Sequence, residues 1–470
     1  MFKTLKERLS IEWCWGLRAV PEGLENVKTL KELTITNMPR EFCNRVGKGG
    51  DDFYKILSLN SEIDAKKEEL GKKMPQHCAE YGFSNWKKKF LRSVVCNFKL
   101  LRVLKFEGIW REEVELPSTI GNLVHLRFLS LRRSKVSRLP SSLGNLVCLQ
   151  TLDLRLRRSG VKVPNVIWKM KELRHLYLPV SGYRGKLKLA TLGNLQSLVN
   201  VAGADCDLNH LAELTNLRKL FIITGGVKNM EEMLKSTGIT FNHIRSLSLS
   251  VGDEVMPMNM VLSCPHIYNL ELAGRMRDKS LEGLQYYQNL TKMSLWDTNL
   301  PLESLKILEK IPNLRMLWLH CVSLDENDSQ VVVSEEGYPN LEFLSLYGLR
   351  GLKSWSIEKG GMPSLCRLSI DSCLELRAVP EGLEHVTTLK ELTIRLMLRR
   401  FCTRVGEGGE DFYKIQHIFG RTEKWITNWG KIIMCFCYLF RLFLRGESEG
   451  ESSVAKVANA AGRGRPISQN

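Results

Sequence analysis

A three-leucine pattern that returns about every two dozen residues constrains the fold of this chain more than any other feature. Three apolar residues follow the spacing L-x-x-L-x-L, as in LRFLSL at residues 126–131, and successive patterns are 22 to 27 residues apart. Self-similarity at a fixed short period is the signature of a repeat architecture. Strands of a sandwich would need hairpin turns about every eight to twelve residues, and these are missing. The first positions of the patterns are Leu101, Leu126, Leu149, Leu173, Leu195, Leu217, Ile244, Ile267, Leu290, Leu314, Leu341, Leu365 and Leu389.

Alternation along a strand decides which side chains of each repeat are buried. In residues 126–131, Leu126, Leu129 and Leu131 should turn inward, whereas Phe128 and Ser130 should stand on the outer face. One repeat cannot bury its own leucines, so neighbouring repeats must stack into a continuous core. The sequence therefore predicts an α/β leucine-rich-repeat solenoid of about thirteen repeats, with a curved parallel sheet on the concave side and an irregular or helical convex side.

One passage occurs twice. Residues 8–56 and 367–415 align without a gap over 49 residues with 36 identities. In the second copy, residues 389–394 form the last predicted strand, and the polar, glycine-rich segment after it is interpreted as a C-terminal cap. A cap presents a polar outer face and offers no leucine-lined end to a following repeat. We therefore expect residues 8–56 to stand apart from the solenoid.

Composition divides the chain into five segments. We predict a duplicated partial repeat and cap at 1–56, a charged connector and solenoid entry at 57–98, the repeat domain with its cap at 99–415, an apolar extension at 416–445 and a disordered tail at 446–470. The apolar run Ile432–Phe440 is shorter than the roughly 20 residues of a spanning helix, which leaves weak membrane-surface contact as its alternative role. A signal peptide is missing and the thirteen cysteines are scattered, which favours a cytoplasmic location.

The net charge of +17 is unevenly distributed. Residues 99–178 hold sixteen Lys and Arg against six Asp and Glu, whereas residues 240–371 hold twelve against sixteen. Clustered cations can bind nucleic acid through its phosphates, but the chain carries no known nucleic-acid-binding motif. We favour a patch for one acidic protein surface.

The concave strand positions are the candidate partner-binding residues. Exposed aromatic side chains on a rigid sheet can bury a large area at small entropic cost, although several could instead pack against their neighbours on the ladder. The basic candidates are Lys105, Arg127, Arg132, Arg155 and Arg174. The aromatic and apolar candidates are Phe128, Tyr177, Trp296, Met316, Trp318, Phe343 and Tyr347.

The sequence favours neither an enzyme nor a cofactor. The nine histidines show no metal-ligand spacing, and Cys373 falls at a buried position of its repeat. A phosphate-cradling G-x-x-x-x-G-K-[ST] loop does not occur. We therefore predict no catalytic, cofactor-binding or metal-binding residues.

Four segments carry a family resemblance: LPSTIGNLVHLRFLSL at 116–131, LPSSLGNLVCLQTLDL at 139–154, LRAVPEGLEHVTTLKELTI at 376–394 and GGEDFYKIQHI at 408–418. They resemble the leucine-rich-repeat domain of plant coiled-coil nucleotide-binding (NLR) disease-resistance proteins. The resemblance implies recognition of a pathogen effector or a guarded host protein, and packing of the first repeats against a nucleotide-binding module. Without a phosphate-binding loop, the chain is interpreted as a truncated or rearranged receptor that would meet such a module in trans. The alternative is a generic repeat scaffold or adaptor.

Overall fold

The computed structural model describes residues 8–12, 32–36, 99–108, 114–157, 161–180, 188–203, 208–223, 232, 234–235, 237–276, 281–324 and 330–419. The chain divides into two units, Met1–Lys431 and Ile432–Asn470, and every described residue belongs to the first. The predicted connector at 57–98, the tail at 446–470 and the apolar run Ile432–Phe440 lie outside the described residues. The structure does not test the predictions for these three segments, which remain predictions.

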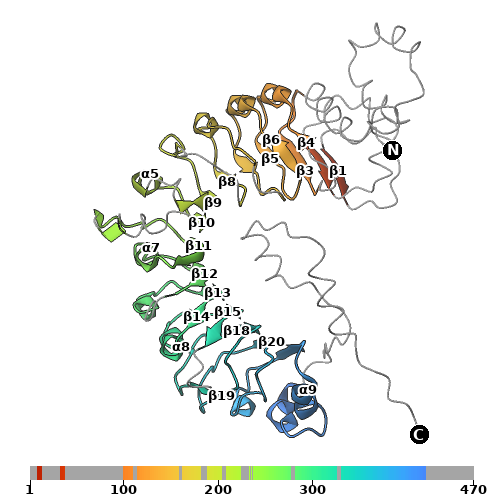
Figure 1. Cartoon of the computed structure of the whole chain (residues 1–470), viewed down its shortest axis with the longest axis vertical. Helices are drawn as coiled ribbons and strands as arrows, with labels where there is room; N and C mark the ends of the chain where they lie inside the picture. Colours follow the sequence, from red (N-terminus) through yellow and green to blue (C-terminus); the bar gives the residue numbers. More distant parts are fainter. Residues whose placement is uncertain are drawn as a thin grey trace, which may run out of the picture. The chain divides into compact units, whose positions relative to one another are not determined.

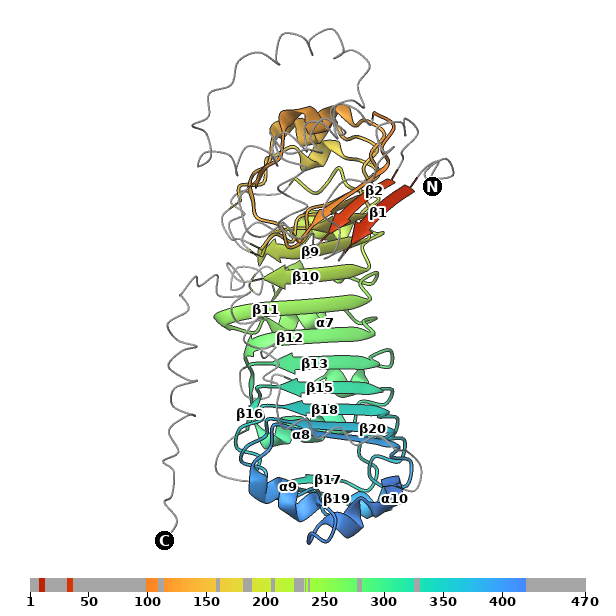
Figure 2. The same ribbon diagram turned by 90° about the vertical axis from the view of Figure 1, so that its right-hand side faces the viewer.

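A parallel sheet of fifteen strands runs through the first unit (Figures 1 and 2). From β3 onward, thirteen strands each begin two residues after the first position of a predicted pattern, which confirms the repeat assignment. The strands are β1 (Arg8–Glu12), β2 (Glu32–Thr36), β3 (Val103–Glu107), β5 (Phe128–Ser130), β7 (Thr151–Asp153), β8 (His175–Tyr177), β9 (Ser197–Ala202), β10 (Lys219–Ile223), β11 (Ser246–Val255), β12 (Asn269–Arg275), β13 (Lys292–Trp296), β15 (Met316–His320), β18 (Phe343–Tyr347), β20 (Arg367–Asp371) and β21 (Glu391–Arg395).

The pattern leucines form the core. Leu126, Leu129 and Leu131 are each 0% exposed, as the alternation predicts. Leu152, Leu176 and Leu198 continue the middle position of the pattern into the next three strands, and all are buried in the same apolar cluster. Because each strand contributes the same inward positions, the core extends from repeat to repeat.

The return segments are helical or irregular, as expected. Figure 1 places the strands on the inner side of the described repeats and α5, α7 and α8 on the outer side. The helical elements are η4 (Ser118–Asn122), η5 (Ser141–Asn145), η6 (Ile167–Lys169), α5 (Leu208–Glu213), α7 (Met258–Leu262), η8 (Leu284–Tyr286), α8 (Leu302–Glu309) and η9 (Leu383–His385). Short strands pair beside the main sheet: β4 (Val114–Glu115) with β6 (Val136–Arg138), β14 (Asn299–Leu300) with β16 (Ser323–Leu324), and β17 (Gln330–Val333) with β19 (Ser354–Ile357).

At several repeats an asparagine side chain forms a hydrogen bond to the repeat before it. The side-chain amide of Asn194 donates to the carbonyl of Lys171 at 3.2 Å, and Asn216 donates to the carbonyl of Gly193 at 2.9 Å. Asn313 and Asn340 make the same contact farther along, at 2.8 Å each. Each bond satisfies a backbone carbonyl of the previous repeat, so it fixes the stacking of the loops without adding to the core.

The N-terminal copy of the duplicated passage joins the sheet. β1 pairs with β2, and β2 pairs in parallel with β3 so that Leu33 lies opposite Leu104 and Ile35 opposite Phe106. The expectation that residues 8–56 stand apart from the solenoid is wrong for these strands. An open strand edge offers backbone hydrogen-bonding groups whatever side chains follow the strand, so a cap sequence beyond β2 does not prevent pairing. Residues 40–56, on which the expectation rested, lie outside the described residues.

Three short helices follow β21: α9 (Arg399–Val405), η10 (Phe412–Lys414) and α10 (Gln416–Phe419). Phe401, Val405 and Ile415 belong to the apolar core, so this segment covers the leucines of the last repeats. Gly409 lies so close to α9 that a Cβ would stand 2.2 Å from the carbonyl oxygen of Arg404. Gly409, the second glycine of GGEDFYKI, is therefore needed for a tight approach of the chain to itself.

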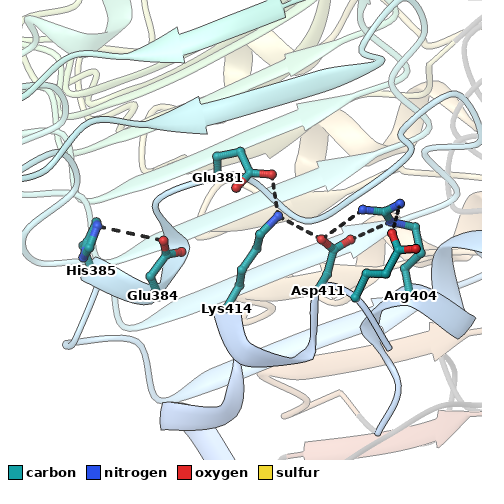
Figure 3. Close-up of polar contacts among 7 residues, drawn as sticks. Glu381, Glu384, His385, Arg404, Asp411 and Lys414 are labelled. Carbon is teal, nitrogen blue, oxygen red and sulfur yellow. Dashed lines mark hydrogen bonds and ion pairs between the residues drawn. The ribbon is translucent and has the colours of Figure 1, made fainter. Parts of the chain in front are cut away.

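A chain of ion pairs holds these helices together (Figure 3). Asp411 accepts from Arg404 Nε at 2.9 Å and from Lys414 Nζ at 2.8 Å. Lys414 also donates to Glu381, in the loop before η9, at 2.5 Å. Lys414 and Asp411 are each only 2% exposed, and buried charges of this kind are tolerated when they are paired and hydrogen-bonded.

Candidate protein-interaction face

Each of the five-residue strands β13, β15, β18 and β20 directs three side chains to the concave face. From β13 to β20 these side chains form three rows across the strands, because the strands pair without a shift. The strand-start row is Lys292, Met316, Phe343 and Arg367. The middle row is Ser294, Trp318, Ser345 and Ser369, and the strand-end row is Trp296, His320, Tyr347 and Asp371.

Trp318 and Phe343 form the expected aromatic contact. Their ring centroids are 5.3 Å apart and the ring planes are inclined by 52°. Trp318 lies between Ser294 and Ser345 in the middle row, so it packs on Phe343 in the neighbouring row of the next strand. Both rings remain partly exposed, whereas Leu317 and Leu319 on the other face are buried.

A second aromatic contact follows the strand-end row. His320 lies between Trp296 and Tyr347, with ring centroids 4.1 Å and 5.6 Å away. Burial lowers the pKa of His320 to about 4, so this imidazole is neutral near pH 7. His320 was not among the predicted site residues, although its alternation with Leu319 marks it as a concave position.

Arg367 is a further concave residue that the predicted set lacks. Its guanidinium carbon lies 5.1 Å from the centre of the Phe343 ring. Planar guanidinium groups are attracted to aromatic faces, and stacking leaves their N–H groups available to an incoming acceptor. Arg367 therefore adds a positive edge to the Trp318 and Phe343 pair.

The basic end of the sheet is less uniform than its sequence indicates. Arg155 donates from Nε to Asp153 at 2.9 Å, and its guanidinium carbon lies 4.4 Å from the centre of the Tyr177 ring. The hydrogen bond to Asp153 raises the pKa of Arg155, and the carboxylate balances its charge in place. Lys105 lies 5.6 Å from the centre of the Phe128 ring. Two predicted aromatic residues thus contact predicted cations of the same face.

Arg127, Arg132 and Arg174 lie outside the strands as the structure has them. Arg127 and Arg174 immediately precede β5 and β8. Their carbonyl oxygens accept hydrogen bonds from backbone N–H groups at the start of the strand in the next repeat, β7 and β9 respectively. Arg132 follows β5, and its carbonyl accepts from Gly108 at 3.0 Å. The three side chains are exposed. Arg127 and Arg174 stand at the rim where the strands begin, whereas Arg132 stands at the opposite rim, in register with Arg155, whose carbonyl accepts from the backbone N–H of Arg133 at 2.9 Å.

Cys373 and the potential metal ligands are further chemical groups among the described residues. Cys373 is 0% exposed, and burial raises the pKa of its thiol to about 11, which keeps it protonated near neutral pH. Within the described ranges, His, Cys, Asp and Glu side chains form no group of three or more that could hold a metal ion. Helices that could cross a membrane are likewise absent from the described part of the chain.

Comparisons with known proteins point to the same repeats. Residues 83–410 match the family described as leucine-rich repeat region. Probable disease resistance RPP8-like protein 2 of Arabidopsis thaliana is 37% identical over 326 residues, which are 68% of this chain and 36% of that protein. Disease susceptibility protein LOV1 of Arabidopsis thaliana is 37% identical over 420 residues, which are 83% of this chain and 45% of that protein. The chain thus spans less than half the length of these relatives.

Solved structures with leucine-rich repeats also resemble the chain. A leucine-rich-repeat protein of Leptospira interrogans is 16% identical, covers 88% of this chain and 94% of its own, and gives a TM-score of 0.44.

Proposed function

The chain belongs to the leucine-rich repeat region family, and from this we propose that it is a protein-recognition module of plant innate immunity. Its partner would be a pathogen effector or a guarded host protein, bound in the cytoplasm on the concave face. The observation that carries the proposal is the contact between Trp318 and Phe343, 5.3 Å apart on that face. Partly exposed aromatic pairs on a rigid sheet are typical anchors of protein interfaces.

The packing indicates that one face of each strand stabilises the core and the other face is available to a partner. Leu317 is 1% exposed and belongs to the core, whereas Trp318 beside it points the other way and is half-buried. The core therefore does not depend on the identity of the concave residues. Similarity to disease resistance proteins makes immunity the favoured setting, and a generic scaffold remains the alternative.

The basic end has a second proposed partner. Lys105, Arg127, Arg132 and Arg174 would face an acidic surface of a nucleotide-binding module supplied in trans. The half-buried Arg155 would contribute less, because Asp153 already balances its charge. An excess of surface cations raises the rate of association with an acidic surface by electrostatic steering.

The test compares Trp318→Ala with Tyr286→Ala in the full chain. Tyr286 is an aromatic residue of η8 on the outer side and is 76% exposed, which makes it a matched control. Partners captured by cross-linking from infected leaf tissue should be lost with Trp318→Ala and kept with Tyr286→Ala. Hot-spot truncations of this kind cost about 2 kcal/mol or more.

Defence activation separates the two functions. Under the proposal, coexpression with a nucleotide-binding module should give a response that depends on Trp318. A generic scaffold would lose its partner with Trp318→Ala but change no response. Equal capture by both variants would contradict recognition at this face.

A further inference from the structure

Positive charge lies on one edge of the aromatic surface that Trp318 and Phe343 form. In the strand-start row, Lys292 and Arg367 stand at either end of Met316 and Phe343. Lys292 and Arg367 are both exposed, and within the described residues neither has a carboxylate partner. Arg315, just before β15, is instead paired with Glu342 at 3.2 Å. Lys292 and Arg367 are therefore the cations that this edge offers to a partner.

The opposite edge has the reverse character. The strand-end row of β13 to β20 holds Trp296, His320, Tyr347 and Asp371, none of which is a cation near pH 7. Asp371 accepts a hydrogen bond from the Ser372 hydroxyl at 2.6 Å. Strand-start and strand-end residues are four positions apart, or about 13 Å. Between β13 and β20 the strand-start row therefore ends in cations and the strand-end row carries none, whereas on β21 Glu391 lies opposite Arg367 and Arg395 lies opposite Asp371.

The middle row joins the aromatic surface to the positive edge. Trp318 is flanked by Ser294 and Ser345, and Ser369 follows on β20. Small neighbours leave the indole as the large side chain of this row among the described strands β13 to β20, and it packs toward Phe343 in the strand-start row. The stacked Arg367 stands on that same Phe343 ring. Aromatic area and positive charge thus adjoin.

We propose that this surface binds a protein segment that carries a carboxylate beside an aromatic side chain. The partner's ring packs on Trp318 and Phe343, and its carboxylate accepts from Arg367 or Lys292. A guanidinium held on a ring is pre-organised for a carboxylate, and charge-assisted hydrogen bonds exceed neutral ones in strength. The inference rests on the proposed function, because it names the chemistry of the partner at the same face.

The experiment selects peptides from a random phage-displayed library on the full chain. Sequences with Asp or Glu within two positions of Trp, Phe or Tyr should be enriched about tenfold, the order expected for one charge-assisted hydrogen bond. Selection on K292E/R367E should favour Lys or Arg at those positions. Lys306→Glu with Lys310→Glu, which reverses two exposed cations in and just after α8 on the outer side, should leave the enrichment unchanged.

The outcomes separate the inference from the proposed function. Circular dichroism melts first establish that each variant is folded. Peptides that need Trp318 but show no acidic preference overturn the inference and leave recognition at this face intact. Peptides that bind equally to wild type and Trp318→Ala contradict both. An acidic preference that survives K292E/R367E also overturns the inference, because other cations would then supply it.

Discussion

Lys414 and Asp411 lie three residues apart in the C-terminal cap, are each 2% exposed, and form an ion pair of 2.8 Å. Without Asp411 the buried ammonium of Lys414 would keep only the exposed carboxylate of Glu381, and breaking a buried pair is costly because a charge loses its buried partner. We expect Asp411→Asn to destabilise the cap by about 3 kcal/mol. Hydrogen exchange of residues 399–419 should accelerate before that of β13. The control is Glu410→Gln, which removes an exposed partner of Arg404 and should cost no more than about 1 kcal/mol.

The same pair predicts a pH dependence. Burial alone would raise the pKa of Asp411, but the hydrogen bonds from Arg404 and Lys414 outweigh it and lower the pKa. A lowered carboxylate pKa contributes stability that is complete above the unfolded value of about 3.9 and is lost as the pH falls through the folded value. The difference in Tm between wild type and Asp411→Asn should be largest near pH 7 and shrink below about pH 4. If the difference in Tm between wild type and Asp411→Asn is the same at pH 7 and pH 3, the ionised Asp411 carboxylate does not cause that difference.

Gly348 allows a test of backbone strain. Gly348 directly follows β18, and its φ of +59° lies in the left-handed region of backbone conformation. A Cβ there would lie 3.4 Å from Cys321 Sγ, an ordinary contact, so conformation alone should decide the effect. Gly348→Ala should cost about 1 kcal/mol in urea unfolding. Gly193→Ala, where a Cβ meets nothing within 4 Å, should be neutral or slightly stabilising. Equal effects at both positions would refute the strain argument.

Pairing of β2 with β3 predicts that the N-terminal copy stabilises the first repeats. Deleting residues 1–56 removes the strand opposite Val103–Glu107 and opens that edge. Exchange of the β3 amides should accelerate about tenfold or more, which corresponds to roughly 1.4 kcal/mol. β18 serves as the internal reference, because a change at an end of a repeat array should fade along it. Unchanged β3 protection would show that the pairing adds nothing.

The basic end predicts a salt dependence. Binding of the full chain to a purified nucleotide-binding module should weaken as ionic strength rises, because surface charges more than about 8 Å apart are screened at physiological salt. Lys105→Gln should lower the association rate more than Arg155→Gln, since Asp153 already compensates Arg155. Surface plasmon resonance at low and high salt measures both effects. An affinity independent of salt would argue against this docking surface.

Much of the fold could be predicted because one pattern controls burial. Leu126, Leu129 and Leu131 repeat with the strand period, so their positions fix β5 and its neighbours. The docking of β2 could not be predicted in the same way. It depends on hydrogen bonds at a strand edge, to which every residue except proline contributes alike.

For the candidate site, the sequence predicts which residues lie on the concave face and in what order, but it does not predict all of their side-chain contacts. Trp318 and Phe343 could be paired in advance because alternation gives their face and their order along the sheet. The cation of Arg367 stacked on Phe343 and the neutral His320 depend on side-chain conformation and burial, which the pattern does not contain. The cap was still harder to foresee, since Glu381 and Lys414 meet across 33 residues.

The way in which these repeats stack has a consequence for how the gene can evolve. Each repeat requires of its neighbour a strand in register, leucines that continue the core and, at several positions, one carbonyl for an asparagine such as Asn216. Differences in repeat length are absorbed on the outer side. A copied stretch of gene can therefore be accepted wherever its strands find an open edge, as the strands of the passage with 36 identities do at both ends of this sheet. Such a protein can lengthen by copying before selection refines the copy.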